Sequence, residues 1–410
     1  MKLSKQVFGV VRRAAWVGAS VVALTVAGPA LASDVIKIGD INSYTNYPDH
    51  LNHYKNGMQI ALDEINGAGG VDGKELVVIT RDDKGTAGDA IRAAEELISR
   101  EKVNALSGSF LSSVALALND FALQNEIPFL ATMSLSDRQI WQEGNRYGFR
   151  LRAGTYLQSA VLAEKAAELK KKRWALIYPN YEFGQLAAVN FKRMLQEVQP
   201  DVEFVAEQAT PLGKIEAGGV VQALIDAKPD AIFSVLFGAD LLKFVRAGST
   251  QGLFDGRDVL AVVAGEPENL EPLKADAPDG WWVTGYPWSD IKTIPEHAAF
   301  LKTYQERFGT HPGISAIMGY TTIKTFAAAF AKAGSTEPDK VAEAMVGLEV
   351  DMPWGKIQYR PQDHVSTIGS FVGKTVNGDN GPMMVESTYK QGDQYQPTDA
   401  MIAEWRKAAQ

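Results

Sequence analysis

The stretch "NGMQIALDEINGAGGVDGKELVVITRDD", residues 56–83, predicts a helix, a glycine turn and a strand, in that order. Its apolar side chains recur at the spacing of one helix face: Met58, Ala61, Leu62 and Ile65. A phosphate-binding loop needs the reverse order, because a strand must lead into glycines that open onto a helix N-terminus. Gly69 and Gly70 therefore predict the left-handed end of the helix, and "VDGK" predicts the turn into the next strand. The stretch favours an α/β scaffold without a nucleotide loop.

The alternation of strand and helix continues through most of the chain. Short apolar runs predict strands, with a restart after the fourth: residues 35–41, 75–83, 103–109, 127–133, 173–179, 202–208, 230–237 and 258–265. Helical patterns lie between and after the last four of these strands: residues 184–199, 215–227, 239–251, 295–308, 315–333 and 338–347. This order is typical of repeated βαβ units, so we expect an α/β fold with two doubly wound parallel-sheet lobes.

Residues 1–32 have the features of a secretory signal peptide. Basic residues form its head, at Lys2, Lys5, Arg12 and Arg13. The apolar run 14–27 is too short for a membrane span, and "ALA" at residues 30–32 matches a cleavage site. We expect cleavage near Ala32 and a mature chain that starts near Ser33. No cysteine follows the site, so we expect no lipid anchor.

Composition excludes several classes of site and partner. The sequence has no cysteine, which removes disulfides, thiolate metal sites and cysteine nucleophiles. The formal net charge is -8, and it is about -12 without the four basic residues of the leader. Nucleic acid requires a basic surface, so we expect no nucleic-acid partner.

Two parallel-sheet lobes create a cleft, and ligands in such folds sit beyond the carboxyl ends of the strands. The predicted strands place these segments there: residues 42–47, 82–83, 110–113, 131–136, 180–184, 208–212, 237–240 and 265–268, with 286–288 on a crossover.

The cleft residues show no pattern of a catalytic or metal site. No G-x-S-x-G motif is present, and the five histidines have no spacing that selects a general base. His50 and His53 beside Asp49 form a metal-like cluster, but zinc needs three or four converging ligands. We therefore expect no catalytic residue, no metal and no cofactor, which is typical of a binding protein rather than an enzyme.

Binding chemistry fits the same positions better. Ser109, Ser112 and Ser113 lie where a strand meets a helix N-terminus, which attracts an anionic group; helix capping is the alternative role. Glu266 and Asp240, from the second lobe, could receive an ammonium group or be surface carboxylates. Aromatic side chains would form a wall or pack in the core: Tyr47, Tyr181, Phe183, Phe237, Tyr286 and Trp288.

Four segments together resemble a known family. They are "IKIGDINSY" (36–44), the stretch 56–83, "LSGSFLSS" (106–113) and "YPNYEFG" (178–184). The chain resembles the periplasmic solute-binding proteins of ABC importers, in the branched-chain amino acid (leucine/isoleucine/valine-binding) family. The resemblance implies a type I fold, in which a three-strand hinge joins two lobes that close over a small molecule. It also implies a periplasmic, monomeric receptor whose partner is an inner-membrane ABC permease.

The resemblance also implies domain boundaries and site residues. We expect residues 33–153 with 284–348 in the N-terminal lobe, 154–283 with 349–396 in the C-terminal lobe, and a helical tail at 397–410. The ligand carboxylate is expected at Leu111, Ser112 and the run Met133, Ser134, Leu135 and Ser136. The amino group is expected at Glu266, and Phe183 takes the position of an aromatic residue. The remaining expected ligand-binding residues line the same cleft: Tyr47, His50, Phe110, Ser113, Tyr181, Phe237, Asp240, Tyr286 and Trp288.

Departures from the family pattern leave the ligand open. "ATMSLSD" puts Leu135 at a position where the family has threonine, unless Ser134 or Ser136 takes it after a shift, and Phe183 lacks a tyrosine hydroxyl. "TGYPWSD" adds bulk at a crossover. We expect a branched-chain amino acid or a related small carboxylate. An aromatic carboxylate or small amide is the alternative ligand, and a sensor for a membrane receptor is the alternative role.

Overall fold

A parallel sheet of five strands organises the first part of the chain in the computed structural model, which describes residues 35–379 and 381–408. Its order is β2-β1-β3-β4-β5, with β1 (Ile36–Asn42), β2 (Leu76–Asp82), β3 (Ala105–Gly108), β4 (Phe129–Ala131) and β5 (Gly148–Arg150). The connecting helices are α1 (Pro48–Gly67), α2 (Ala87–Glu96) with a π-helical turn (Leu97–Glu101), α3 (Ser112–Gln124) and α4 (Arg138–Trp141). The strand order reverses between β1 and β3, as in doubly wound folds.

A second sheet of seven strands has the order β14-β13-β10-β9-β8-β6-β7. Its parallel strands are β6 (Arg173–Pro179), β7 (Glu203–Thr210), β8 (Ala231–Ser234), β9 (Asp258–Gly265) and β10 (Trp282–Gly285), and β13 (Ser370–Gly378) and β14 (Gly381–Lys390) are antiparallel. Its helices are α5 (Thr155–Leu169), α6 (Glu182–Val198), α7 (Ala217–Asp226), α8 (Gly238–Thr250) and α9 (Pro267–Leu270), which continues into a 3-10 turn (Glu271–Asp276). All of β9 after its first residue is buried, as expected for a parallel strand covered on both faces.

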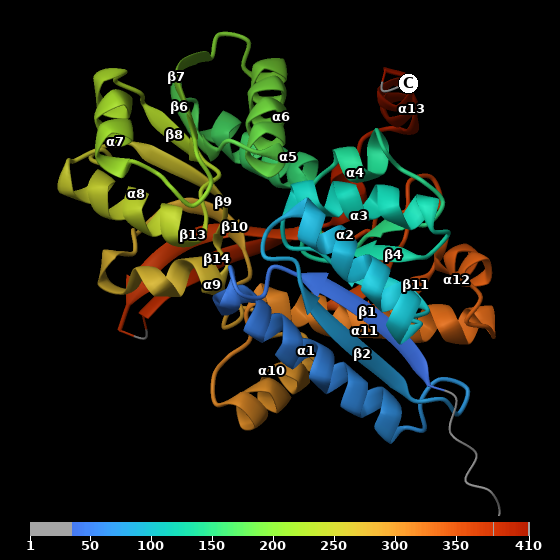
Figure 1. Cartoon of the computed structure of the whole chain (residues 1–410). Coiled ribbons are helices and arrows are strands. Elements are labelled where there is room, and N and C mark those ends of the chain that lie inside the picture. Colours follow the sequence, from blue (N-terminus) through green and yellow to red (C-terminus); the bar gives the residue numbers. More distant parts are fainter. Residues whose placement is uncertain (1–34, 380, 409–410) are drawn as a thin grey trace, which may run out of the picture. The chain divides into compact units, whose positions relative to one another are not determined.

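The chain passes between the two sheets three times, after β5, after β10 and before β13. The helices after β10 are α10 (Pro295–Phe308), α11 (Ile314–Ala333) and α12 (Pro338–Met345), and α11 runs beside α1 (Figure 1). The hairpin of β11 (Glu349–Met352) and β12 (Gly355–Gln358) contacts α11. We name the five-stranded sheet with α1 to α4 and α10 to α12 the first lobe, and the seven-stranded sheet with α5 to α9 the second lobe. This arrangement confirms the predicted α/β fold class.

The end of the chain returns to the first lobe. A 3-10 turn (Gly392–Tyr395) and α13 (Asp399–Ala408) follow β14, and α13 contacts α4. The rings of Trp405 and Trp141 lie 5.4 Å apart between centroids. Among the described residues, none of the helices is both long and apolar enough to span a membrane. The predicted signal peptide and its cleavage site lie outside the described residues.

The glycines after α1 end the helix, as predicted. Gly69 and Gly70 have φ values of 103° and 74°, and the N–H of Gly70 donates to the carbonyl of Ile65 at 2.9 Å. The capping residue Ala68 is not itself left-handed, with φ of -84°. A bridge between Val71 and Lys74 then turns the chain toward β2. These glycines lie on a turn between helix and strand, so the nucleotide-loop reading has no support in the geometry.

Candidate functional site

A pocket lies where the two lobes meet. Its walls come from both sheets: His50, Phe110, Ser112, Met133, Leu135, Arg152, Tyr181, Phe183, Phe237, Val263, Glu266 and Asn269. Phe110 and Ser112 follow β3, while Tyr181 and Phe183 follow β6. These loops lie at the carboxyl ends of strands next to the reversal of strand order in each sheet, where α/β folds bind ligands.

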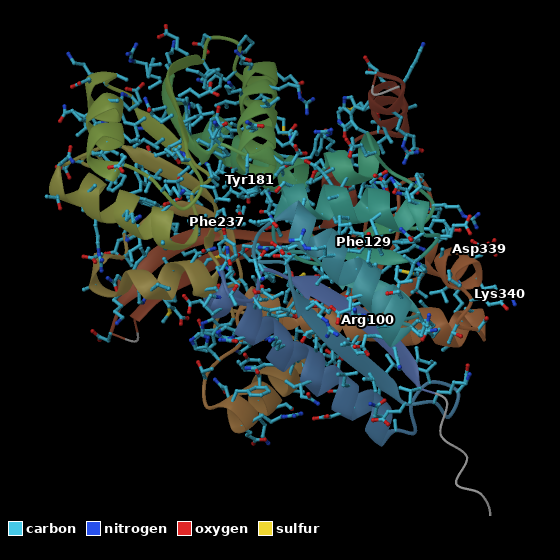
Figure 2. The ribbon with its side chains drawn as sticks, viewed as in Figure 1. Arg100, Phe129, Tyr181, Phe237, Asp339 and Lys340 are labelled. Atoms are coloured by element: carbon cyan, nitrogen blue, oxygen red, sulfur yellow. The ribbon has the colours of Figure 1, made fainter. Side chains whose placement is uncertain are left out.

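Aromatic rings from both lobes form one side of the pocket. Phe110 of the first lobe and Phe237 of the second lobe lie 6.1 Å apart between centroids, and Tyr47 stacks on Phe110 at 4.3 Å from outside the pocket. Phe183 meets Phe237 edge to face at 5.9 Å. Figure 2 labels Tyr181 and Phe237, which come from the loops after β6 and β8. The rings offer a wide apolar surface to the body of a small molecule.

A buried ion pair forms the charged part of the wall. The guanidinium of Arg152 donates to the Glu266 carboxylate, and the two residues are only 6% and 3% exposed. Asn269 Nδ2 also donates to Glu266, at 3.3 Å. Burial lowers the pKa of Arg152 to about 10, although the charge of Glu268 acts in the other direction. Arg152 therefore stays a cation at neutral pH.

Arg152 is the main residue that sequence reasoning missed. It stands two residues after β5, a strand of only three residues that no apolar run marks. Its signal was its place in "RLRAG" (150–154), a charged residue just beyond a strand end. Glu266 was predicted to face an ammonium group of the ligand, and the structure places it in the pocket wall beside this arginine. Val263 and Asn269 were also missed, and no distinctive signal marks them.

His50 is an uncharged polar group in the pocket wall. It is 4% exposed, and burial lowers its pKa to about 4, against the opposing effect of the Glu268 charge. Its ring lies 5.0 Å from that of Phe110, edge to face. At neutral pH the imidazole is neutral and can donate or accept one hydrogen bond.

A second acid, Glu268, joins the lobes beside the pocket. It follows β9 in the second lobe, and its carboxylate accepts the N–H groups of Ser315 at 2.8 Å and Ile314 at 3.2 Å. These are the first residues of α11 in the first lobe. Burial alone would raise the pKa of Glu268, but His50, His53 and the Ser315 N–H more than offset it, and the pKa is lowered. Glu268 is therefore an anion that caps a helix across the cleft.

Comparison with known proteins matches this architecture. A model of the periplasmic binding protein family matches residues 36–380. The chain belongs to the periplasmic binding protein family. It is 24% identical over 349 residues to a Leu/Ile/Val-binding protein homologue of Brucella melitensis, covering 80% of this chain and 85% of that protein. A leucine-, isoleucine-, valine-, threonine- and alanine-binding protein of Pseudomonas aeruginosa is 23% identical over 342 residues, covering 82% and 90%.

Solved structures of ABC transporter binding proteins share the fold of this family member. One from Rhodopseudomonas palustris, in complex with 3,4-dihydroxybenzoic acid, has a TM-score of 0.78 at 24% identity over 87% of this chain and 98% of that one. A branched-chain amino acid binding protein of Streptococcus pneumoniae, in complex with isoleucine, has a TM-score of 0.75 at 19% identity over 87% and 99%. The predicted resemblance to solute-binding proteins of ABC importers is confirmed.

In this periplasmic binding protein, some predicted ligand residues lie outside the pocket. Tyr47, Leu111 and Asp240 line a wider outer cleft instead. The Asp240 carboxylate is occupied by the N–H groups of Gly213 at 2.6 Å and Ile215 at 3.2 Å. It therefore caps the loop after β7.

Other predicted residues of this family member have structural partners. Ser113 is exposed, because one step along α3 turns it away from Ser112. Ser134 accepts the N–H of Ser136, whose own hydroxyl donates to Glu182 at 2.9 Å. Ser109, also singled out from its sequence position, donates to the Leu111 carbonyl.

The two predicted aromatic residues of the crossover pack away from the pocket. Tyr286 is buried, with its hydroxyl 2.7 Å from His297 Nε2. Trp288 stacks on His311 at 4.1 Å between centroids. Within residues 35–379 and 381–408, no group of three or more metal-ligating side chains is positioned to hold a metal ion. His53 Nδ1, part of the metal-like cluster, instead lies 2.7 Å from the Tyr304 hydroxyl.

Proposed function

We propose that this protein binds an α-amino acid with an apolar or aromatic side chain between its lobes and delivers it to an inner-membrane ABC permease. The observation that carries the proposal is the buried Arg152–Glu266 ion pair in the pocket wall. The family supplies the transport role, since its relatives and structural neighbours are solute-binding proteins of ABC transporters.

Charge balance favours a zwitterion over a simple carboxylate. Arg152 and Glu266 cancel each other, and His50 is neutral at neutral pH. A zwitterion can place its carboxylate on Arg152 and its ammonium on Glu266, so every buried charge keeps an opposite partner. A simple carboxylate would add an unbalanced negative charge beside Glu266, and burying such a charge is costly.

The rest of the wall suits an apolar side chain. Met133 and Leu135 from the loop after β4 face the pocket together with Phe183 and Phe237 of the second lobe. Transfer of apolar area into such surroundings supplies roughly 25 cal/mol per Å². The side chain of an aliphatic or aromatic amino acid therefore contributes favourable binding free energy in addition to that of its head group.

We propose that the two lobes move as the units of closure. Second-lobe carboxylates make the polar contacts that support a closed state: Glu268 on α11, Glu182 on the Ser136 hydroxyl at 2.9 Å, and Glu271 on His311 at 2.9 Å. A ligand that contacts both lobes stabilises the closed form that a permease recognises. We propose a monomeric receptor without catalytic activity, exported to the periplasm through the N-terminal leader.

An aromatic carboxylate is the second candidate ligand. Structural neighbours were solved with 4-hydroxybenzoate and with benzoate, and the aromatic wall would accept such a ring. This ligand would bind Arg152 only if Glu266 took up a proton or moved away from the guanidinium. Uptake of a proton on binding is therefore its signature.

Isothermal titration calorimetry with matched pairs tests the proposal. L-phenylalanine is compared with 3-phenylpropanoate, L-leucine with 4-methylpentanoate, and benzoate is added as the rival. We expect the amino acids to bind at least tenfold more tightly than their deaminated analogues. Glu266→Gln should abolish this preference, while Glu203→Gln, on the exposed Glu203 that pairs with Arg173 in the second lobe, should keep it. Binding only to the acids that lack an amino group would refute the amino-acid assignment.

A sensory role is the alternative within the same fold. Proteoliposomes that contain the cognate permease distinguish the two, because a transport receptor should stimulate ATP hydrolysis only with its amino acid present. A closed, liganded protein that leaves the permease unstimulated would contradict the transport role.

A further inference from the structure

The pocket has two polar ends, and only one of them is charged. At the first end, Arg152 and Asn269 both donate to the Glu266 carboxylate. The second end consists of the Ser112 hydroxyl and the Tyr181 phenol, and the His50 imidazole also lines the pocket. Within the part of the chain that the structure describes, none of these three groups has a hydrogen-bond partner. Polar groups that face a pocket without a partner are suited to a polar group of the ligand.

The order of the strands separates the two ends. In the first lobe, Arg152 follows β5 and Ser112 follows β3, with β4 between them. In the second lobe, Glu266 follows β9 and Tyr181 follows β6, with β8 between them. Two strand spacings amount to about 10 Å in each sheet. Both lobes therefore give the same distance along the cleft from the charged end to the uncharged polar end.

The segment between the ends is apolar. Met133 and Leu135 follow the intervening β4, and Phe237 follows the intervening β8. Phe183 meets Phe237 at 5.9 Å and Tyr181 at 6.2 Å between centroids. A ligand that spans the pocket must then be charged at one end, apolar in the middle and able to form hydrogen bonds at the other end.

We propose that Tyr181 and Ser112 recognise a hydroxyl group at the tip of the ligand, so the protein prefers an amino acid of the tyrosine type over its unhydroxylated analogue. This inference rests on the proposed amino-acid function and deepens it. It assigns Ser112 to the far end of the ligand's side chain. The family resemblance implies a different role for Ser112, which is to bind the ligand carboxylate. Phe183 lacks the hydroxyl that the family places there, and Tyr181, two residues earlier, supplies one.

The protonation state of this end supports the assignment. Burial raises the pKa of Tyr181 well above its ordinary value, and the neighbouring Tyr47 adds to this effect. Both the phenol and the neutral His50 therefore remain uncharged hydrogen-bonding groups at neutral pH. An uncharged end favours a hydroxyl over a second carboxylate or ammonium group, because a buried charge would lack an opposite partner.

Calorimetry with L-tyrosine and L-phenylalanine tests the inference, since the pair differs by one oxygen. The wild-type protein should bind L-tyrosine at least about tenfold more tightly. Tyr181→Phe should remove most of this preference and change L-phenylalanine affinity less than about twofold. Ser112→Ala should weaken L-tyrosine selectively. Tyr395→Phe is the matched control, because the Tyr395 hydroxyl donates to Glu164 outside the pocket. It should leave the preference intact.

Two results would overturn the inference without touching the proposed function. One is equal affinity of the wild-type protein for the two amino acids. The other is an equal loss of affinity for L-tyrosine and L-phenylalanine in Ser112→Ala. This result would mean that Ser112 binds the head group of the ligand. If neither amino acid binds, the zwitterion assignment fails instead. In that case the affinities for 4-hydroxybenzoate and benzoate test whether the protein recognises the hydroxyl group. A preference for 4-hydroxybenzoate that Tyr181→Phe abolishes supports the inference. Equal affinities for the two acids refute it.

Discussion

The Glu268 carboxylate of the second lobe accepts the N–H of Ser315 at 2.8 Å, in the first turn of α11 of the first lobe. A helix of 20 residues thus receives an anion at its positive end from the opposite side of the cleft. The contact joins the lobes next to the pocket without using a pocket residue. It is one of the carboxylate contacts that join the lobes, with Glu182 on Ser136 and Glu271 on His311.

We predict that Glu268→Gln weakens solute binding about fivefold to tenfold. The amide keeps one acceptor oxygen but loses the charge that the helix N-terminus favours, so the closed form becomes less stable relative to the open one. Calorimetric titration with the best-bound amino acid measures the loss. Glu203→Gln serves as the control, because Glu203 pairs with Arg173 on the surface of its own lobe. Unchanged affinity in Glu268→Gln would show that this cap does not contribute to closure.

Gly313→Ala tests the same contact without changing any charge. The backbone of Gly313 suits alanine, with φ of -85° and ψ of 176°. A Cβ there would nevertheless lie 2.1 Å from the Glu268 carboxylate carbon, so the side chain must leave its place on α11. We expect a loss of affinity close to that of Glu268→Gln. Gly219→Ala is the matched control, since a Cβ at that helical position meets no atom within 4 Å. An effect of equal size in both glycine variants would contradict this explanation.

The pattern of apolar residues predicted many strands and helices well, because a long element leaves a clear signal in the sequence. Residues 258–265 and 295–308 coincide with β9 and α10. The three-residue β5 left no such signal, and Arg152 was missed with it. Helical periodicity turns Ser113 out to solvent although it adjoins Ser112. No local pattern could pair Glu266 with Arg152, because the two are 114 positions apart and meet only when the lobes come together.

The stability of the protein should fall between pH 6.5 and pH 4 partly because of His50. Burial lowers its pKa to about 4, so the unfolded chain takes up a proton in this range before the folded protein does. The stabilising contribution is complete above pH 6.5 and is lost as the pH falls toward 4. His50→Gln should therefore reduce the drop in unfolding free energy between pH 7.5 and pH 5 by about 2 kcal/mol. Urea unfolding of both proteins at the two pH values measures the difference.

His311 is a control, because its effect on the pH dependence of stability should have the opposite sign to that of His50. Burial lowers its pKa, but the hydrogen bond and charge of Glu271 outweigh this and the pKa is raised. Its contribution is present at low pH and is lost as the pH rises through the raised value. His311→Gln should therefore make the drop toward pH 5 steeper. Identical pH dependence in wild type, His50→Gln and His311→Gln would contradict both assignments.

Removing only Arg152 from the Arg152–Glu266 pair should lower the free energy of unfolding more than replacing both residues. Arg152→Met leaves the Glu266 carboxylate buried without its cation, so we expect a loss of about 3 to 5 kcal/mol in unfolding free energy. Adding Glu266→Gln removes the unpaired charge, and the double variant should recover more than half of that loss. It should nevertheless bind no zwitterion, because both charged partners of the ligand are gone. Urea unfolding and calorimetry on the three variants separate the two effects. A double variant less stable than Arg152→Met would mean that Glu266 is held by Asn269 rather than by the arginine, and binding of L-phenylalanine by the double variant would remove the pair from the recognition site.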